Sequence, residues 1–216
     1  MTGKPQFCYS ALPRSGTGPG ILVLHAWWGL NDFTREYCQR LAREGFVALA
    51  PDLYQGKTAN TIDEAQQYRS SLNQKQVHVD ILRALEQLRG LPELIGAPLG
   101  VVGFSLGANW ALWLSQEKPE LIKAVAVYYG TKGGDYAPAQ AAYLGHFAET
   151  DPYTAASGVK KLEKSLRAAG RPVTFHTYPG TGHWFCEDDR PEAYQAAAAE
   201  LAWERTVEFL RAQLNQ

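Results

Sequence analysis

The sequence has few of the residues that define disulfide-rich, zinc-binding or nucleic-acid-binding proteins. Its 216 residues include only three cysteines, Cys8, Cys38 and Cys186, an odd number without paired spacing. This count argues against a disulfide framework or a zinc knuckle and is typical of a reducing compartment. The formal net charge is only −1, whereas proteins that bind nucleic acid usually carry a basic face. We therefore expect no nucleic-acid partner.

Long hydrophobic runs are also missing from the sequence. The N-terminal stretch has no apolar run of the length found in signal peptides. No segment approaches the roughly 20 apolar residues that cross a bilayer. From these absences we expect a cytoplasmic protein without a membrane partner.

The overall composition is that of an ordinary soluble globular protein, with 45% hydrophobic and 20% charged residues. A chain of this length fits one domain and can bury a sizeable core. Because there is no repeat, low-complexity linker or break in composition, we expect a single domain over residues 1–216.

Short apolar runs alternate with helical patterns along the chain. The expected strands are 20–26, 46–54, 99–104, 123–130, 141–149 and 173–179. The expected helices begin after Asn31 or Asp32, cover 61–90 in two pieces, cover 108–117, include 159–166, and run from Pro191 to Leu210. This alternation predicts an α/β fold with a mostly parallel sheet, helices on both faces and no large lid domain.

The pentapeptide Gly103-Phe104-Ser105-Leu106-Gly107 lies between an expected buried strand and an expected helix. Average residue usage gives about 0.07 such G-x-S-x-G patterns by chance in a chain of this length. In this context the pattern favours a nucleophile elbow, where glycines leave room for a sharp turn that exposes the serine. The alternative is a serine that caps the helix after a tight turn. The glycine spacing does not fit a dinucleotide site.

A serine nucleophile needs a base and an orienting acid, which follow it in the chain in the order acid, then histidine. Of the histidines after Ser105, His146 and His176 lie in strand patterns, whereas His183 lies in the glycine-rich loop YPGTGHWF. We therefore predict His183 as the base. Asp151, just past an expected strand and before a proline, is the predicted acid, with Glu149 and Asp135 as rivals.

An oxyanion hole requires two backbone N–H groups. We predict that Leu106, the residue after the nucleophile, and Trp27, in the loop after the first strand, supply them. Aromatic residues near strand ends predict the rim of an apolar substrate pocket. These are Trp28, Tyr54, Tyr129, Tyr136, Trp184 and Phe185.

These motifs resemble those of the dienelactone hydrolase family of α/β-hydrolases, over nearly the whole chain. The matching stretches are HAWWGLNDFTREYCQRLAREGFVALAPDLY (25–54), GVVGFSLGANWAL (100–112), LGHFAETDPYT (144–154), YPGTGHWF (178–185) and AELAWERTVEFL (199–210), the last carrying the family's Arg-Thr pair as Arg205 and Thr206. The resemblance implies an α/β-hydrolase fold and a catalytic triad of Ser105, Asp151 and His183. It implies no metal and no organic cofactor.

Three departures from the family pattern bear on the chemistry. Ser105 stands where the best-known members have cysteine, and Ala26 stands where they have a glutamate that is thought to gate this cysteine. Glu187 stands where an arginine of the family holds the substrate carboxylate, and residues 60–64 contain no second arginine. An anionic substrate would therefore lose a charge-assisted bond and meet a negative charge.

Together these observations predict a carboxylic ester hydrolase that resembles carboxymethylenebutenolidase. It would cleave a small neutral ester or lactone through an acyl-serine intermediate. The alternatives are a thioesterase or amide hydrolase with the same triad, and a binding protein that has lost turnover. A monomer or a weak homo-oligomer is expected.

Overall fold

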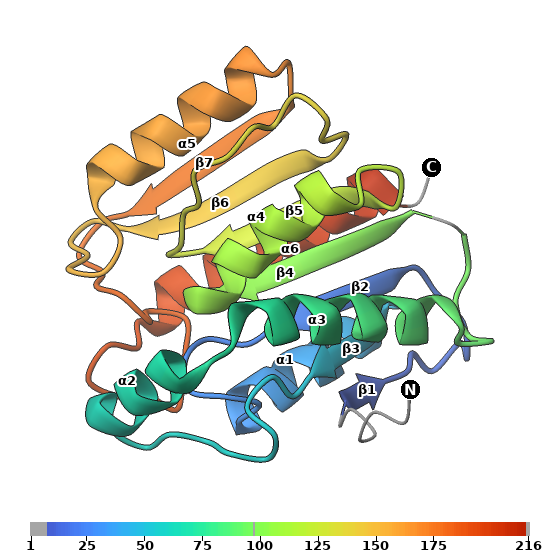
Figure 1. Cartoon of the computed structure of the whole chain (residues 1–216), viewed down its shortest axis with the longest axis horizontal. Coiled ribbons are helices and arrows are strands. Elements are labelled where there is room, and N and C mark those ends of the chain that lie inside the picture. The colour runs from blue at the N-terminus through green and yellow to red at the C-terminus, as the bar shows by residue number, and fades with distance from the viewer. Residues whose placement is uncertain (1–7, 97, 215–216) are drawn as a thin grey trace. The chain divides into compact units, whose positions relative to one another are not determined.

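The computed structural model describes residues 8–96 and 98–214, in which helices and strands alternate along the chain (Figure 1). The chain divides into two units, Met1–Ala97 and Pro98–Gln216. That residues 1–216 act as one domain stays a prediction.

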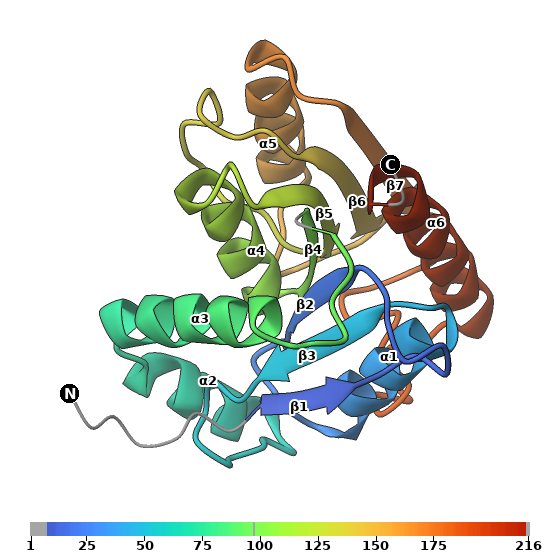
Figure 2. The same ribbon diagram turned by 90° about the vertical axis from the view of Figure 1, so that its right-hand side faces the viewer.

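In residues 8–96, the N-terminal unit has three strands and three helices. Its elements are β1 (Cys8–Ala11), β2 (Gly20–Leu24), α1 (Asp32–Arg43), β3 (Val47–Pro51), α2 (Ile62–Ser71) and α3 (Gln74–Arg89). β3 pairs with β2 in parallel and with β1 antiparallel (Figure 2). All residues of β2 and β3 are buried, which explains why both faces of these strands are apolar. The sequence pattern did not predict β1, which is short and partly exposed.

The C-terminal unit is a parallel sheet in the order β4-β5-β6-β7. Its elements are β4 (Leu99–Phe104), α4 (Leu106–Glu117), β5 (Ile122–Tyr128), β6 (Ala142–Ala148), α5 (Ala156–Ala168), β7 (Val173–Tyr178) and α6 (Ala196–Leu214). Figure 2 shows α4 and α5 on one face of these strands and α6 on the other. The predicted mostly parallel α/β architecture, with helices on both faces, is confirmed within this unit.

The last helix begins later than the sequence predicts. The prediction places its start at Pro191, but residues 191–193 form a turn, residues 194–195 are irregular and α6 begins at Ala196. The amide of Gln195 donates to the carbonyl of Phe185, which draws this segment back toward the loop that follows β7. The predicted apolar stripe of α6 is confirmed, because Trp203, Val207 and Leu210 are buried. Within 8–96 and 98–214, no helix combines the length and apolar character that crossing a membrane would require.

Candidate active site

Ser105 lies at a sharp turn between β4 and α4. Its backbone has φ +49° and ψ −107°, a strained conformation for a residue other than glycine. A side chain at Gly103 would collide with the backbone of Gly107 and Ala108, which explains the need for glycine at that position. The side chain of Ser105 makes no capping hydrogen bond to α4, so the helix-cap interpretation finds no support in the geometry.

The predicted nucleophile, base and acid form a continuous hydrogen-bonded chain. His183 Nδ1 donates to Asp151 Oδ2 over 2.7 Å, and Ser105 Oγ lies 2.8 Å from His183 Nε2. The side chains of His183 and Asp151 are only 3% and 5% exposed. The three residues follow β4, β6 and β7, whose carboxyl ends share one edge of the parallel sheet.

A turn around Asp151 fixes its carboxylate. Oδ1 accepts hydrogen bonds from the backbone amides of Tyr153 and Thr154, both over 2.8 Å. Neither residue was predicted from the sequence, although an aspartate that binds amides two and three residues ahead is a common turn pattern. The rival acids are engaged elsewhere: Glu149 accepts from the amide of Gly180 and Asp135 from the amide of Ala137.

The two histidines that the sequence places in strands, His146 and His176, make no hydrogen bond to Ser105 in the described part of the chain. His146 on β6 is fully buried, with Nδ1 2.7 Å from Tyr178 Oη and Nε2 2.9 Å from Thr206 Oγ1. Burial lowers the pKa of His146 well below its ordinary value, so it is neutral. His176 on β7 is half-buried. Among the described residues, no three His, Cys, Asp or Glu side chains are grouped as they would be around a metal ion.

The two predicted oxyanion donors belong to different units. Leu106 is the first residue of α4, where backbone N–H groups have no acceptor within the helix. Trp27 follows β2 in the N-terminal unit and is buried, with its ring edge-on to Trp28 at 5.5 Å between centroids. Tyr54, in the same unit, packs edge-on against His25 at 5.1 Å. Their roles stay predictions.

The predicted aromatic residues of the C-terminal unit fall into two groups. The rings of Tyr129 and Trp184 contact the His183 ring, at 4.8 and 5.0 Å between centroids, and Phe185 contacts Tyr129 at 5.7 Å. Tyr136 instead packs against Tyr143 near the start of β6, so the structure groups it with the other end of that strand. The sequence could not separate these groups, because Tyr136 lies in an irregular loop after β5.

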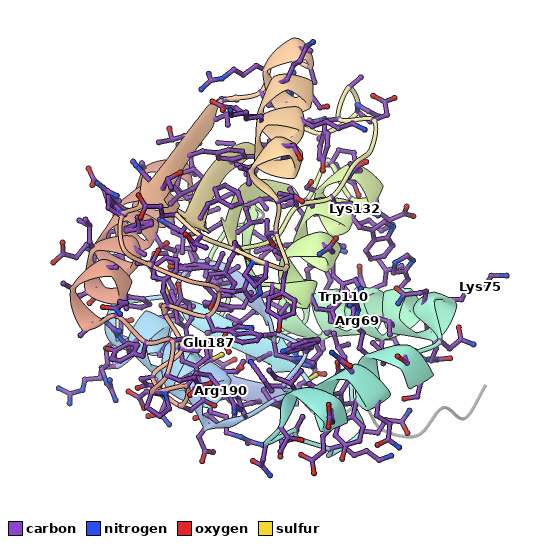
Figure 3. The ribbon with its side chains drawn as sticks, turned by 90° about the vertical axis from the view of Figure 1, so that its left-hand side faces the viewer. Arg69, Lys75, Trp110, Lys132, Glu187 and Arg190 are labelled. Carbon is purple, nitrogen blue, oxygen red and sulfur yellow. The ribbon has the colours of Figure 1, made fainter. Side chains whose placement is uncertain are left out.

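Glu187 is buried within the segment that joins β7 to α6, where Figure 3 also labels Arg190. Its Oε1 accepts a 2.7 Å hydrogen bond from the hydroxyl of Tyr129. Its Oε2 has no hydrogen-bond partner in the described part of the chain. Burial raises the pKa of this carboxyl to about 8, and the bond from Tyr129 opposes the rise only in part. No sequence pattern indicated the pairing of Glu187 with Tyr129.

Comparisons with known proteins find relatives of this chain over most of its length. The model of the dienelactone hydrolase family matches residues 8–214. Protein usf of Aquifex pyrophilus is 31% identical over 96% of this chain and 93% of its own length. A protein of Methylorubrum extorquens named "Putative carboxymethylenebutenolidase" is 32% identical over 94% of this chain and 75% of its own length.

The fold also agrees with a solved structure. The crystal structure of a "Putative Dienelactone Hydrolase" from Klebsiella pneumoniae has a TM-score of 0.84 and 25% identity, and the match covers 96% of this chain and 93% of that one. The match of the family model over nearly all the described residues, together with this fold, shows that the chain belongs to the dienelactone hydrolase family of α/β-hydrolases.

Proposed function

We propose that this chain is a serine hydrolase that cleaves a small neutral ester or lactone through an acyl-serine intermediate. The observation that carries the proposal is the hydrogen-bonded chain from Ser105 through His183 to Asp151. A serine is a weak nucleophile unless a base is in hydrogen-bond contact and a third group orients that base. A protein that only binds a ligand has no need for all three groups.

In the proposed reaction, the hydrogen bond from His183 to Asp151 leaves Nε2 unprotonated and directed at Ser105. Nε2 accepts the hydroxyl proton as Oγ attacks the substrate carbonyl carbon. The carbonyl oxygen becomes an oxyanion, and Asp151 stabilises the imidazolium that forms. His183 then returns the proton to the departing alkoxide, which leaves an acyl group on Ser105. A water molecule, deprotonated by His183, releases the acid and restores the serine.

The amide of Leu106 and the amide of Trp27 are the proposed oxyanion donors. Leu106 is supported by its position at the N-terminus of α4, where the helix dipole also favours negative charge. Trp27 is supported by its place in the loop after the first parallel strand, from which this fold takes the second donor.

The buried carboxyl of Glu187 supports a neutral substrate. A buried arginine would attract a substrate carboxylate, whereas a glutamate offers no cation at that position. The name of the Methylorubrum extorquens relative supports a lactone among the candidate substrates. Thioesters and amides are the alternative acyl donors. A cytoplasmic location, a monomer or weak homo-oligomer, and the lack of nucleic-acid or membrane partners stay expectations from the composition.

The experiment combines p-nitrophenyl acetate hydrolysis with labelling by a serine-reactive phosphonate. The wild type is expected to hydrolyse the ester and to be labelled, and Ser105→Ala is expected to lose both. Ser15→Ala, which removes an exposed hydroxyl in the N-terminal unit, is the matched control and should behave as the wild type. Absence of labelling in the wild type would favour a binding protein. A panel of esters, lactones, thioesters and amides then ranks the acyl donors.

A further inference from the structure

We propose that Tyr129 is a positioning residue for His183, and that the buried carboxyl of Glu187 holds Tyr129 in this role. The proposal rests on the proposed function, because the orientation of the imidazole matters for turnover only if His183 is the base. Three observations carry it: the constrained backbone of Tyr129, its contacts with His183 and with Thr154, whose amide binds Asp151, and the bond between its hydroxyl and Glu187.

The backbone of Tyr129 is held in an unfavourable conformation. It follows the last residue of β5 and has φ +37°, in the left-handed region that aromatic residues rarely adopt. Its amide donates a 2.7 Å hydrogen bond to the carbonyl of His146, and the residue is fully buried. The next residue, Gly130, approaches the Ser105 carbonyl so closely that no side chain fits there. Such strain is found mainly where a function requires the geometry.

Tyr129 contacts both the base and the residues that fix the acid. Its ring lies 4.8 Å from the His183 ring, with 60° between the planes, an edge-on arrangement that limits rotation of the imidazole. Its carbonyl accepts a 2.8 Å hydrogen bond from Thr154 Oγ1, and the Thr154 amide donates to Asp151. A displacement of Tyr129 would therefore disturb the imidazole and the carboxylate at the same time.

The hydroxyl of Tyr129 is fixed by Glu187, four residues after His183. A buried carboxyl is costly unless it is hydrogen-bonded, and Oε2 of Glu187 has no partner among the described residues. Asp188, Asp189 and Arg190 of its own segment and Tyr129 after β5 are the ionisable groups that act on it. An apolar residue at this position would avoid the cost but would leave the Tyr129 hydroxyl without its acceptor. The presence of a buried carboxyl at position 187 therefore points to a role in orienting the Tyr129 side chain.

The proposal predicts a specific pattern among variants. Tyr129→Phe removes the hydroxyl, and Glu187→Leu removes its acceptor, so each should lower kcat about tenfold with little change in KM. The double variant should be no worse than either single variant, because both break the same contact. Glu187→Gln keeps an oxygen that accepts from Tyr129 and should restore kcat to within about twofold of the wild type.

The experiment measures kcat and KM for p-nitrophenyl acetate and the thermal midpoint of each variant. Tyr143→Phe is the control, since Tyr143 is also buried and bonded, to Ser115, near the other end of β6. It should keep the wild-type kcat. Because a variant with a weakened fold would lose activity for a trivial reason, the proton NMR signal of the Nδ1–H shared with Asp151 is measured as well. This signal should be altered in Tyr129→Phe and Glu187→Leu and unchanged in Tyr143→Phe.

Two results would overturn the proposal. In one, Tyr129→Phe and Glu187→Leu keep kcat within twofold and leave the Nδ1–H signal unchanged. In the other, Glu187→Gln loses as much kcat as Glu187→Leu, so that the acceptor is not what matters. Failure of the proposed function is distinguished by Ser105→Ala, which would then keep its activity or its phosphonate labelling.

Discussion

Replacement of Glu187 by glutamine tests the burial of this carboxyl through the pH dependence of stability. In the folded chain its pKa is raised from an ordinary value of 4.5 to about 8, chiefly by burial. The folded state therefore holds the proton up to a higher pH than the unfolded state does. The wild type loses stability as the pH rises from about 4.5 to about 8, and then reaches a plateau. A glutamine side chain does not titrate, so Glu187→Gln lacks this loss.

The size of the effect follows from the two pKa values. At 1.36 kcal/mol for each pKa unit, the rise from 4.5 to about 8 corresponds to about 5 kcal/mol. Linkage gives about 2 kcal/mol of this at pH 6 and nearly all of it at pH 9. The quantity to compare is the free energy of unfolding of Glu187→Gln minus that of the wild type. Compared with its value at pH 4, this difference should be about 2 kcal/mol larger at pH 6 and about 5 kcal/mol larger at pH 9.

Urea denaturation at pH 4, 6, 7.5 and 9, followed by the fluorescence of the six tryptophans, measures this difference. Groups that titrate equally in both proteins cancel in the subtraction. Tyr143→Phe serves as the control, because the Tyr143 hydroxyl has a pKa of about 12 and does not titrate in this range. Its difference from the wild type should be constant. A constant difference for Glu187→Gln as well would refute the reasoning, because it would mean that this carboxyl is not buried in the folded state.

Four further substitutions test the site and the fold. Asp151→Asn should lower kcat by about 10⁴-fold with a small change in KM, because the amide does not fix the imidazole tautomer as the carboxylate does. Ester hydrolysis kinetics measure both constants, and a loss of kcat below tenfold would exclude Asp151 as the orienting acid. Gly103→Ala should cost about 1–3 kcal/mol, since the new methyl group meets the backbone of the following helix, and an unchanged thermal midpoint would contradict the elbow geometry. Glu187→Arg should raise the rate on an anionic ester relative to a neutral one by about tenfold, and an equal ratio in both proteins would end the argument from charge. His146→Gln should lose less stability than the wild type as the pH falls below 6.5. Burial lowers the pKa of His146 in the folded state, so acid protonates this histidine more readily in the unfolded wild-type chain and favours unfolding. Identical acid denaturation curves for the two proteins would disprove this.

Several features of this protein follow from short stretches of sequence. The elbow follows from a short stretch, because a side chain at Gly103 would meet the backbone of Gly107 and Ala108, only a few residues along the chain. The strands that became β2, β4 and β5 are readable because burial on both faces leaves continuous apolar runs. His183 could be selected because its loop lies at the end of the last strand and carries the glycines that a tight loop requires. All of these are local properties of the chain.

Other features depend on contacts between residues far apart in the sequence. β1 exists because β3 offers it an edge, and its own four residues carry no strong pattern. The start of α6 is decided by the bond of Gln195 to Phe185 rather than by the proline at 191. Tyr129 and Glu187 are 58 residues apart, and their pairing depends on how the loops after β5 and β7 converge.

The sequence alone therefore determined the fold class, the turn that carries Ser105 and the loop that carries His183, since each follows from patterns within short stretches of the chain. Only the tertiary structure decided that Asp151 rather than Glu149 reaches the imidazole, that Tyr136 packs away from His183, and that a buried glutamate holds Tyr129. The physical reason is that hydrogen bonds and ring contacts act over a few ångströms in space. Distance along the chain does not report such proximity until the strands and loops have been assembled.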